Sequence, residues 1–117
     1  MHNIRELKVW NKAIDLAVKV YKISADFPSD ERFGLISQTR RSSVSIPSNI
    51  SEGAGRNTNG EFKQFLGIAN GSSYELQTQM VIANRLGFID TQLCDEVLDN
   101  IDEIQKTTYN LQKTLNK

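Results

Sequence analysis

The chain has 117 residues, 38% of them hydrophobic, and its 14 basic and 14 acidic side chains give a formal net charge of zero. This length and composition fit a single soluble globular domain over residues 1–117, and the neutral charge is unlike the basic excess of a dedicated nucleic-acid-binding protein. The one cysteine, Cys94, excludes an intramolecular disulfide, and no apolar run approaches the ~20 residues of a membrane-spanning helix. The N-terminus lacks the apolar segment of a secretory signal peptide. We therefore expect a cytoplasmic protein that is not inserted in a membrane.

The first predicted helix extends from about Val9 to Ser24, where apolar residues recur at steps of three and four. Its apolar side chains form two stripes, Trp10–Ala17–Tyr21 and Val9–Leu16–Ile23. Contact with one bundle core needs an apolar face only ~100° wide. The second stripe therefore predicts self-association of the chain.

The second predicted helix starts with Ser29 or Asp30 as its N-cap and Glu31 in its first turn. Helical spacing continues through Pro47 to about Glu52. The residues that keep this spacing are apolar or small, namely Leu35, Thr39, Ser43, Ile46 and Ile50. Proline removes one backbone donor and crowds the preceding turn, so we predict a kink at Pro47.

The region around Pro47 has two alternative interpretations. A strand would rest only on the alternation of Val44 and Ile46. A phosphate-binding loop at Gly53 to Gly55 would need a preceding strand and a lysine, and neither is present. We therefore predict that the second helix ends at these glycines, which supply a positive φ at its exit.

Thr58 and Glu61 have the spacing of a capping box and start the third predicted helix, which ends at Gly87. Asp90 caps the fourth predicted helix, whose first half is rich in acidic residues. Its apolar seam consists of Leu93, Val97, Ile101, Ile104, Leu111 and Leu115. Short connections make neighbouring helices antiparallel. The sequence thus predicts an all-α, up-down-up-down four-helix bundle with a kinked second helix.

The residue types in the chain give little support to a catalytic site or a metal site. A di-iron bundle needs histidines on facing helices, and the only histidine is His2. The serines have no histidine base, and Cys94 opens an acidic helix, which disfavours a thiolate. We predict no catalytic, cofactor-binding or metal-binding residue, no cofactor and no enzymatic activity.

Arg40, Arg41 and Arg56 are the candidate contacts for a nucleic acid or another partner. In one interpretation all three lie on one phosphate-binding surface. In the other, one of the two adjacent arginines pairs with a carboxylate and its neighbour is solvated, because adjacent residues point about 100° apart on a helix.

Glu75 is predicted to lie at least partly buried on the inner edge of the third helix. A buried carboxylate needs a partner, and the candidates are Arg40, Arg41 or the small polar groups of the second helix. Asn49 and Glu52 are three residues apart. We predict that they join Glu75 in one structural polar network.

Two segments carry a resemblance that extends over nearly the whole chain: "QTRRSSVSIPSNISEG" at residues 38–53 and "GSSYELQTQ" at residues 71–79. Together with "LKVWNKAIDLAVKVY" and "LGFI", they make the chain similar to the four-helix-bundle proteins named for the 23S rRNA intervening sequence. The resemblance implies an antiparallel bundle whose second helix continues through Pro47. It also implies a ring-like homopentamer.

The resemblance suggests partners as well. A related branch of the family serves as the accessory protein of diversity-generating retroelements, and its basic pentamers bind reverse transcriptase and nucleic acid. This chain is neutral and has an acidic last helix, so we expect weak, salt-sensitive nucleic-acid binding at most. The predicted function is a non-enzymatic oligomeric scaffold for an RNA or an RNA-handling protein. The alternative is an enzyme or small-ligand binder with a site between subunits.

Overall fold

The computed structural model describes residue 3 and residues 7–115, and His2 lies outside the described residues. The described residues contain four α-helices, one short 3-10 helix and no strand. The helices are α1 (Lys8–Ser24), η2 (Ser29–Glu31), α2 (Leu35–Ala54), α3 (Asn59–Arg85) and α4 (Thr91–Thr114). The predicted all-α, four-helix fold is therefore confirmed.

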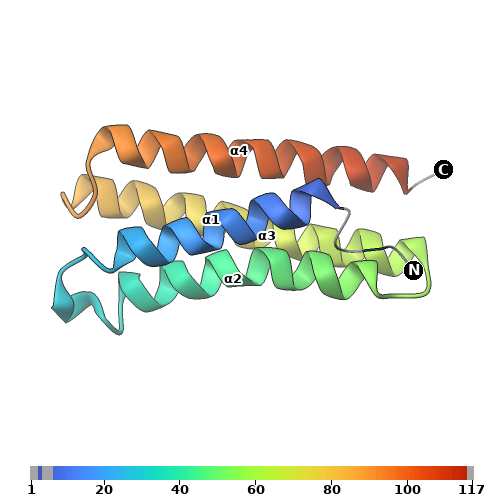
Figure 1. The fold of residues 1–117 in the computed structure, drawn as a ribbon, viewed down its shortest axis with the longest axis horizontal. Coiled ribbons are helices and arrows are strands. Elements are labelled where there is room, and N and C mark those ends of the chain that lie inside the picture. The colour runs from blue at the N-terminus through green and yellow to red at the C-terminus, as the bar shows by residue number, and fades with distance from the viewer. Residues whose placement is uncertain (1–2, 4–6, 116–117) are drawn as a thin grey trace.

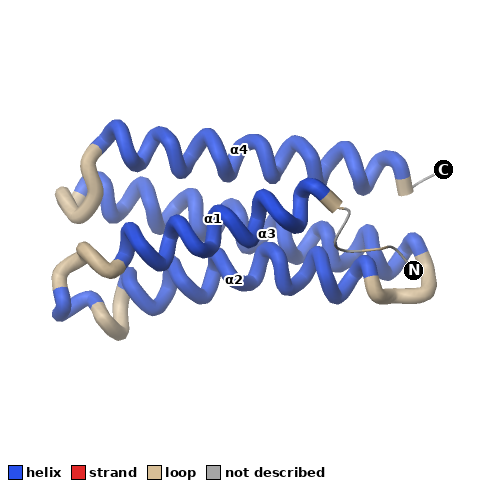
Figure 2. The backbone as a smooth tube through the Cα atoms, in the orientation of Figure 1, coloured by secondary structure: helices blue, strands red, loops and turns tan. Residues whose placement is uncertain are grey.

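Each α-helix runs back along the one before it, so consecutive helices are antiparallel (Figure 1). The connections are confined to the two ends of the molecule (Figure 2). The helices α1 and α2, α2 and α3, and α3 and α4 pack against each other, and α4 closes the ring against α1. The result is an elongated bundle of 45 × 23 × 20 Å.

The core consists of apolar side chains contributed by all four helices. Those with almost no exposed surface include Ala13, Leu16, Ile46, Ile50, Leu66, Leu76, Val97 and Ile101. Burying one large aliphatic side chain contributes about 1.5 to 3 kcal/mol. Of the two predicted stripes of α1, Val9 and Leu16 lie in this core, whereas Tyr21 is 44% exposed.

The start of α2 differs from the prediction. Ser29 and Asp30 belong to η2, and α2 begins only at Leu35. The Glu31 carboxylate accepts a hydrogen bond of 3.2 Å from the backbone N–H of Leu35. An acidic side chain from the preceding turn thus satisfies one of the free amides at the helix start, a role that the sequence had assigned to Ser29 or Asp30.

Helix α2 continues through a buried Pro47 to Ala54, two residues beyond the predicted end. Helical continuation past Pro47 is confirmed, and the strand alternative is wrong. The kink at Pro47 stays a prediction.

The prediction for Gly53 is wrong. Gly53 lies inside α2, and the residue that ends this helix, Gly55, has a φ of −82°. A Cβ atom on Gly53 would lie 2.7 Å from Cβ of Phe65 and 3.0 Å from Cδ1 of Phe62, both on α3. Gly53 is therefore required for the close approach of α2 and α3, and not for a left-handed backbone conformation.

Local signals mark both ends of α3 correctly. The Thr58 hydroxyl oxygen accepts from the Glu61 N–H at 3.1 Å and donates to the Glu61 carboxylate at 3.0 Å, so half of the capping box forms as predicted. At the other end, Gly87 has a φ of 79°, and the Phe88 N–H donates to the carbonyl of Ala83 at 2.9 Å. This geometry is a Schellman motif, and it turns the chain toward α4.

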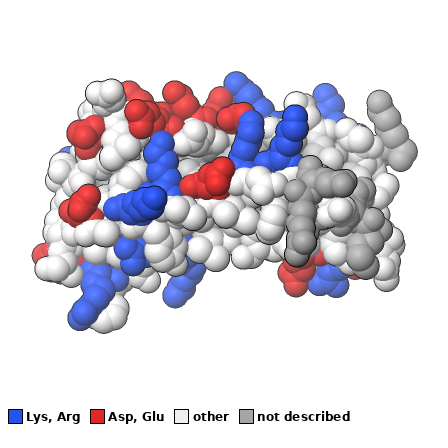
Figure 3. Space-filling view, viewed as in Figure 1, with Lys and Arg blue, Asp and Glu red and all other residues white. Residues whose placement is uncertain are grey.

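The Asp90 carboxylate caps α4 by accepting a hydrogen bond of 2.8 Å from the Leu93 N–H, as predicted. Acidic side chains gather over the N-terminal half of this helix (Figure 3). Two of them are neutralised by α1, because Glu96 pairs with Lys19 and Glu103 pairs with Lys12. These two ion pairs join α4 to α1, where the bundle closes.

Candidate interaction surfaces

Arg40 ties α2 to the end of α1. Its Nε atom donates to the Ser24 hydroxyl at 2.8 Å, and its terminal nitrogen donates to the Tyr21 carbonyl at 3.1 Å. The guanidinium group also lies over the Tyr21 ring, 4.6 Å from its centroid. The positive charge is placed where the C-terminal carbonyls of α1 favour a cation. Arg40 is therefore bound within the chain, but to a helix end and not to the predicted carboxylate.

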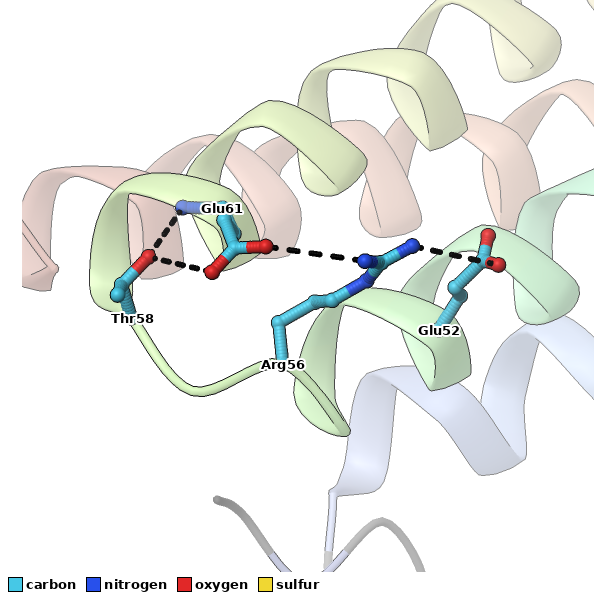
Figure 4. A network of polar contacts seen from close by, with 4 residues as sticks. All are labelled: Glu52, Arg56, Thr58 and Glu61. Atoms are coloured by element: carbon cyan, nitrogen blue, oxygen red, sulfur yellow. Dashed lines mark hydrogen bonds and ion pairs between the residues drawn. The ribbon is translucent and has the colours of Figure 1, made fainter.

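Arg56 joins the end of α2 to the start of α3. Its guanidinium group lies between the carboxylates of Glu52 and Glu61, at 3.7 Å from each (Figure 4). It also stacks over the Phe65 ring at 4.8 Å. Two carboxylates beside one cation leave no local excess of positive charge to attract a phosphate.

Arg41 differs from both. It is exposed, and within the described part of the chain it makes no hydrogen bond or ion pair. Arg56 follows Arg41 by 15 residues, which corresponds to about 22 Å along a helix. The structure therefore does not bring Arg40, Arg41 and Arg56 together on one surface.

The predicted polar network of Asn49, Glu52 and Glu75 does not form as one unit. Asn49 donates to the carbonyl of Ser45 at 2.8 Å and to its hydroxyl at 3.0 Å. The Ser45 hydroxyl lies 2.8 Å from that of Ser72, which links α2 to α3. Glu52 lies nearer the C-terminal end of α2 and pairs with Arg56 instead.

Glu75 is exposed, not partly buried as predicted, because it lies on the outer edge of the contact between α2 and α3. Its carboxylate accepts a hydrogen bond of 2.7 Å from Ser42 and one of 3.4 Å from Gln79. A small polar group of α2 is thus its partner, whereas neither Arg40 nor Arg41 pairs with it in the described structure.

A buried polar layer between α3 and α4 was not predicted. Gln105 donates to the Ser73 hydroxyl at 3.2 Å and to the Gln77 side chain at 3.1 Å. One turn farther along, Thr108 donates to Asn70 at 3.1 Å. Thr108 interrupts the apolar seam of α4 between Ile104 and Leu111, and this interruption was the available signal in the sequence.

Cys94 is buried, and its Sγ atom lies 3.6 Å from the carbonyl oxygen of Met80. Burial raises the pKa of the Cys94 thiol, and the negative charge of Asp95 raises it further. The thiol is therefore protonated near neutral pH, which agrees with an unreactive, structural cysteine.

An apolar groove runs between the outer sides of α1 and α2, with a volume of about 460 Å³. Its apolar lining consists of Ile14, Ala17, Val18, Tyr21, Val44 and Pro47. Val18 is 49% exposed and Val44 is 42% exposed, although both lie on regular helices. Lys22 contributes the one charged side chain of this lining. We call this surface the α1–α2 groove.

The groove is extended by a second hollow of about 570 Å³. The two share Ile14 and Pro47, and Trp10, Ser48, Ser51 and Glu52 line the remainder of the second. The surface between α1 and α2 is largely uncharged in the middle of Figure 3, in contrast to the α4 edge. The apolar part of this surface, in the α1–α2 groove, is typical of an interaction site.

Residue 3 and residues 7–115 contain no group of three or more side chains able to hold a metal ion. None of the helices in that part of the chain is long and apolar enough to cross a membrane.

Comparisons with known proteins identify one family and one similar solved structure. The model of the 23S rRNA-intervening sequence protein family matches residues 5–110. A crystal structure of a protein of unknown function from the S23 ribosomal protein family of Bacteroides thetaiotaomicron is similar, with a TM-score of 0.81 and 24% identity over 90% of this chain and 98% of that one. At this identity the likeness supports the fold alone. No curated protein matches the chain.

Proposed function

This chain belongs to the 23S rRNA-intervening sequence protein family, and from that premise we propose that it is a non-enzymatic, oligomeric scaffold that binds other proteins. The observation that carries the oligomeric part of the proposal is the α1–α2 groove, where Val18 and Val44 are exposed on rigid helices. Covering such a surface is favourable by about 25 cal/mol for each Å² removed from water.

Protein partners are favoured over RNA because of the state of the arginines. Nucleic-acid surfaces gather unpaired cations along one face. Here Arg40 is bound to the end of α1, and Arg56 lies between two carboxylates. Only Arg41 of the three is free of such contacts among the described residues. An RNA or an RNA-handling protein remains the other outcome of the test below.

A non-enzymatic role is supported by how the potential nucleophiles are used. Ser42 binds Glu75, and Ser45 lies against Ser72, so both hydroxyls serve the contact between α2 and α3. The Cys94 thiol is buried with a raised pKa. We further propose a cytoplasmic location, where this cysteine would stay reduced, and a homopentamer, a number that comes from the family resemblance alone.

The test uses the full tagged chain and two variants. Val44→Asp places a charge in the groove, and Gln92→Asp adds the same charge at an exposed position of α4. We expect the wild type and Gln92→Asp to keep the mass of an oligomer and to retain the same proteins from a nuclease-treated native lysate, and Val44→Asp to lose both. Light scattering on the purified wild type should give the mass of an oligomer.

Three results would overturn the proposal in different ways. A monomeric wild type would remove the oligomeric scaffold. Partners that disappear on nuclease treatment, with a high ratio of absorbance at 260 to 280 nm, would replace the protein scaffold with an RNA-binding one. A small molecule retained at a contact between subunits would favour the enzyme or small-ligand alternative.

A further inference from the structure

A second apolar surface lies on the outer side of α3. Its residues follow one another at steps of three and four, which places them on one helix face. They are Ile68, Gly71, Tyr74, Thr78 and Ile82, and we call them the α3 face. Ile68 is 46% exposed, Tyr74 is 55% exposed and Ile82 is 44% exposed. Three large apolar side chains are thus presented to solvent along four turns of one rigid helix.

Gly71 is the informative member of this face. Glycine in the middle of a helix is less stable than alanine, so its presence there calls for a compensating contact. Gly53 has such a contact, because a Cβ atom would collide with Phe65. At Gly71 a Cβ atom would meet nothing within 4 Å. Packing within the chain therefore does not require a glycine at this position, whereas the close approach of a helix from another chain would.

We propose that the α3 face of one copy packs into the α1–α2 groove of a second copy. This inference rests on the oligomeric scaffold proposed above and assigns the surfaces that form it. The groove is an apolar hollow. The α3 face presents apolar side chains around Gly71, where no side chain covers the backbone.

The charges beside the two surfaces are complementary. Lys22 lines the groove, and among the described residues no carboxylate pairs with it. Glu75 adjoins the α3 face and, within residues 7–115, accepts hydrogen bonds only from Ser42 and Gln79 and pairs with no cation. Lys22 of one copy and Glu75 of the next are therefore the pair that this contact brings together.

The two surfaces can be used by one copy at the same time. Helices α1 and α3 are diagonal in the bundle, since α1 packs on α2 and α4, and α3 packs on the same two helices. The groove and the α3 face therefore point in different directions. A contact between different surfaces is heterologous, and it forms a closed ring when the rotation between copies divides a full turn. Both α1 and α3 run in the same direction along the bundle (Figure 1), so α3 of one copy would lie parallel to α1 of its neighbour in a ring whose axis runs along the bundles.

The decisive experiment mixes two variants that each lose one surface. Val18→Glu puts a carboxylate in the groove and leaves the α3 face intact. Gly71→Glu puts one on the α3 face and leaves the groove intact, and its side chain meets open space within the chain. A carboxylate introduced into an apolar contact should weaken association by about 100-fold or more. We expect each variant alone to be a monomer by light scattering, and an equimolar mixture to form a dimer of one copy of each.

Gly60→Glu is the matched control. Gly60 is also exposed on α3 with nothing within 4 Å of a Cβ atom, but it lies at the start of the helix, away from the α3 face. This variant should keep the wild-type mass. Circular dichroism and thermal melting should show that Val18→Glu and Gly71→Glu are folded, as expected for two exposed positions.

The outcomes separate this contact from the scaffold itself. If both variants keep the wild-type mass, or if Gly71→Glu stays associated while Val18→Glu does not, the assigned surfaces are wrong and the oligomer stands. If the two monomeric variants fail to combine, the contact is not heterologous. A monomeric wild type would overturn the oligomeric scaffold and this inference together.

Discussion

Gly53 and Gly71 show how the surroundings of a glycine determine the effect of an added side chain on stability. Both lie within long helices, where alanine is favoured over glycine by about 1 kcal/mol. Gly53 faces Phe65 and Phe62 of α3 at less than contact distance for an added Cβ atom. Gly71 faces open space. The same substitution should therefore have opposite effects at the two positions.

Gly53→Ala should destabilise the chain by about 1 to 3 kcal/mol, because overpacking outweighs the gain in helix propensity. Urea unfolding followed by circular dichroism measures this difference, with both substitutions made in the Val18→Glu background so that association does not contribute.

Gly71→Ala is the control, and it should stabilise the same background by up to about 1 kcal/mol. An unchanged or increased stability in Gly53→Ala would show that α2 and α3 can separate without cost. A loss of stability in Gly71→Ala would mean that its surroundings within the chain are closer than the structure shows.

The Cys94 thiol gives stability a defined pH dependence. Its pKa is raised in the folded chain by burial and by Asp95. As pH rises past the ordinary thiol pKa, the unfolded chain ionises first, so the free energy of unfolding falls with pH. The full contribution is present below that pKa. We expect Cys94→Ala to have a shallower decline than the wild type in unfolding experiments at alkaline pH, and equal slopes would contradict a raised pKa.

At the scale of elements, Arg40 holds the end of α1 against α2 through two hydrogen bonds and the Tyr21 ring. Arg40→Ala should lower the free energy of unfolding by about 1 to 2 kcal/mol. Arg41→Ala removes the same side chain from the next position, where it is exposed and makes no hydrogen bond or ion pair in the described structure, and should change stability by less than about 0.5 kcal/mol. Chemical denaturation of the pair measures the difference, and equal losses would refute the assigned role of Arg40.

The signals that predicted the elements correctly were local in sequence. Asp90 needs only the N–H of Leu93, three residues away, and Gly87 needs only the helix that it ends. The start of α2 was misplaced because Glu31 caps Leu35 from a separate 3-10 turn, which adds a break that residue preferences do not reveal.

The candidate site was harder to predict because its contacts cross between helices. The partners of Arg40 are on α1, and those of Glu75 depend on which serine of α2 lies opposite. Spacing along one helix cannot specify such a register. For the same reason, Gly53 was assigned to a turn when the residue that explains it, Phe65, lies on the next helix.

At the scale of the whole molecule, the distribution of charge predicts weak binding to nucleic acid. Arg56 is neutralised, and the acidic half of α4 opposes any attraction by the rest of the surface. Fluorescence anisotropy with a labelled single-stranded RNA at physiological salt should give a Kd of about 10⁻⁵ M or weaker. Arg41→Ala should reduce the residual binding, and Arg56→Ala should not. Tight binding that survives Arg41→Ala would place the RNA surface elsewhere.

Self-association should not depend on the salt concentration, in contrast to RNA binding. The proposed contact joins apolar surfaces and contains one ion pair, between Lys22 and Glu75 of neighbouring copies. At about 1 M salt the screening length is only a few Å, so an exposed ion pair is weakened. Salt does not weaken the burial of apolar surface. Light scattering should therefore give the same oligomer mass from about 0.1 M to 1 M sodium chloride. Dissociation at high salt would show that charges dominate the contact. The contact would then be assigned to the charged side chains Lys22, Arg41 and Glu75 and not to the apolar groove.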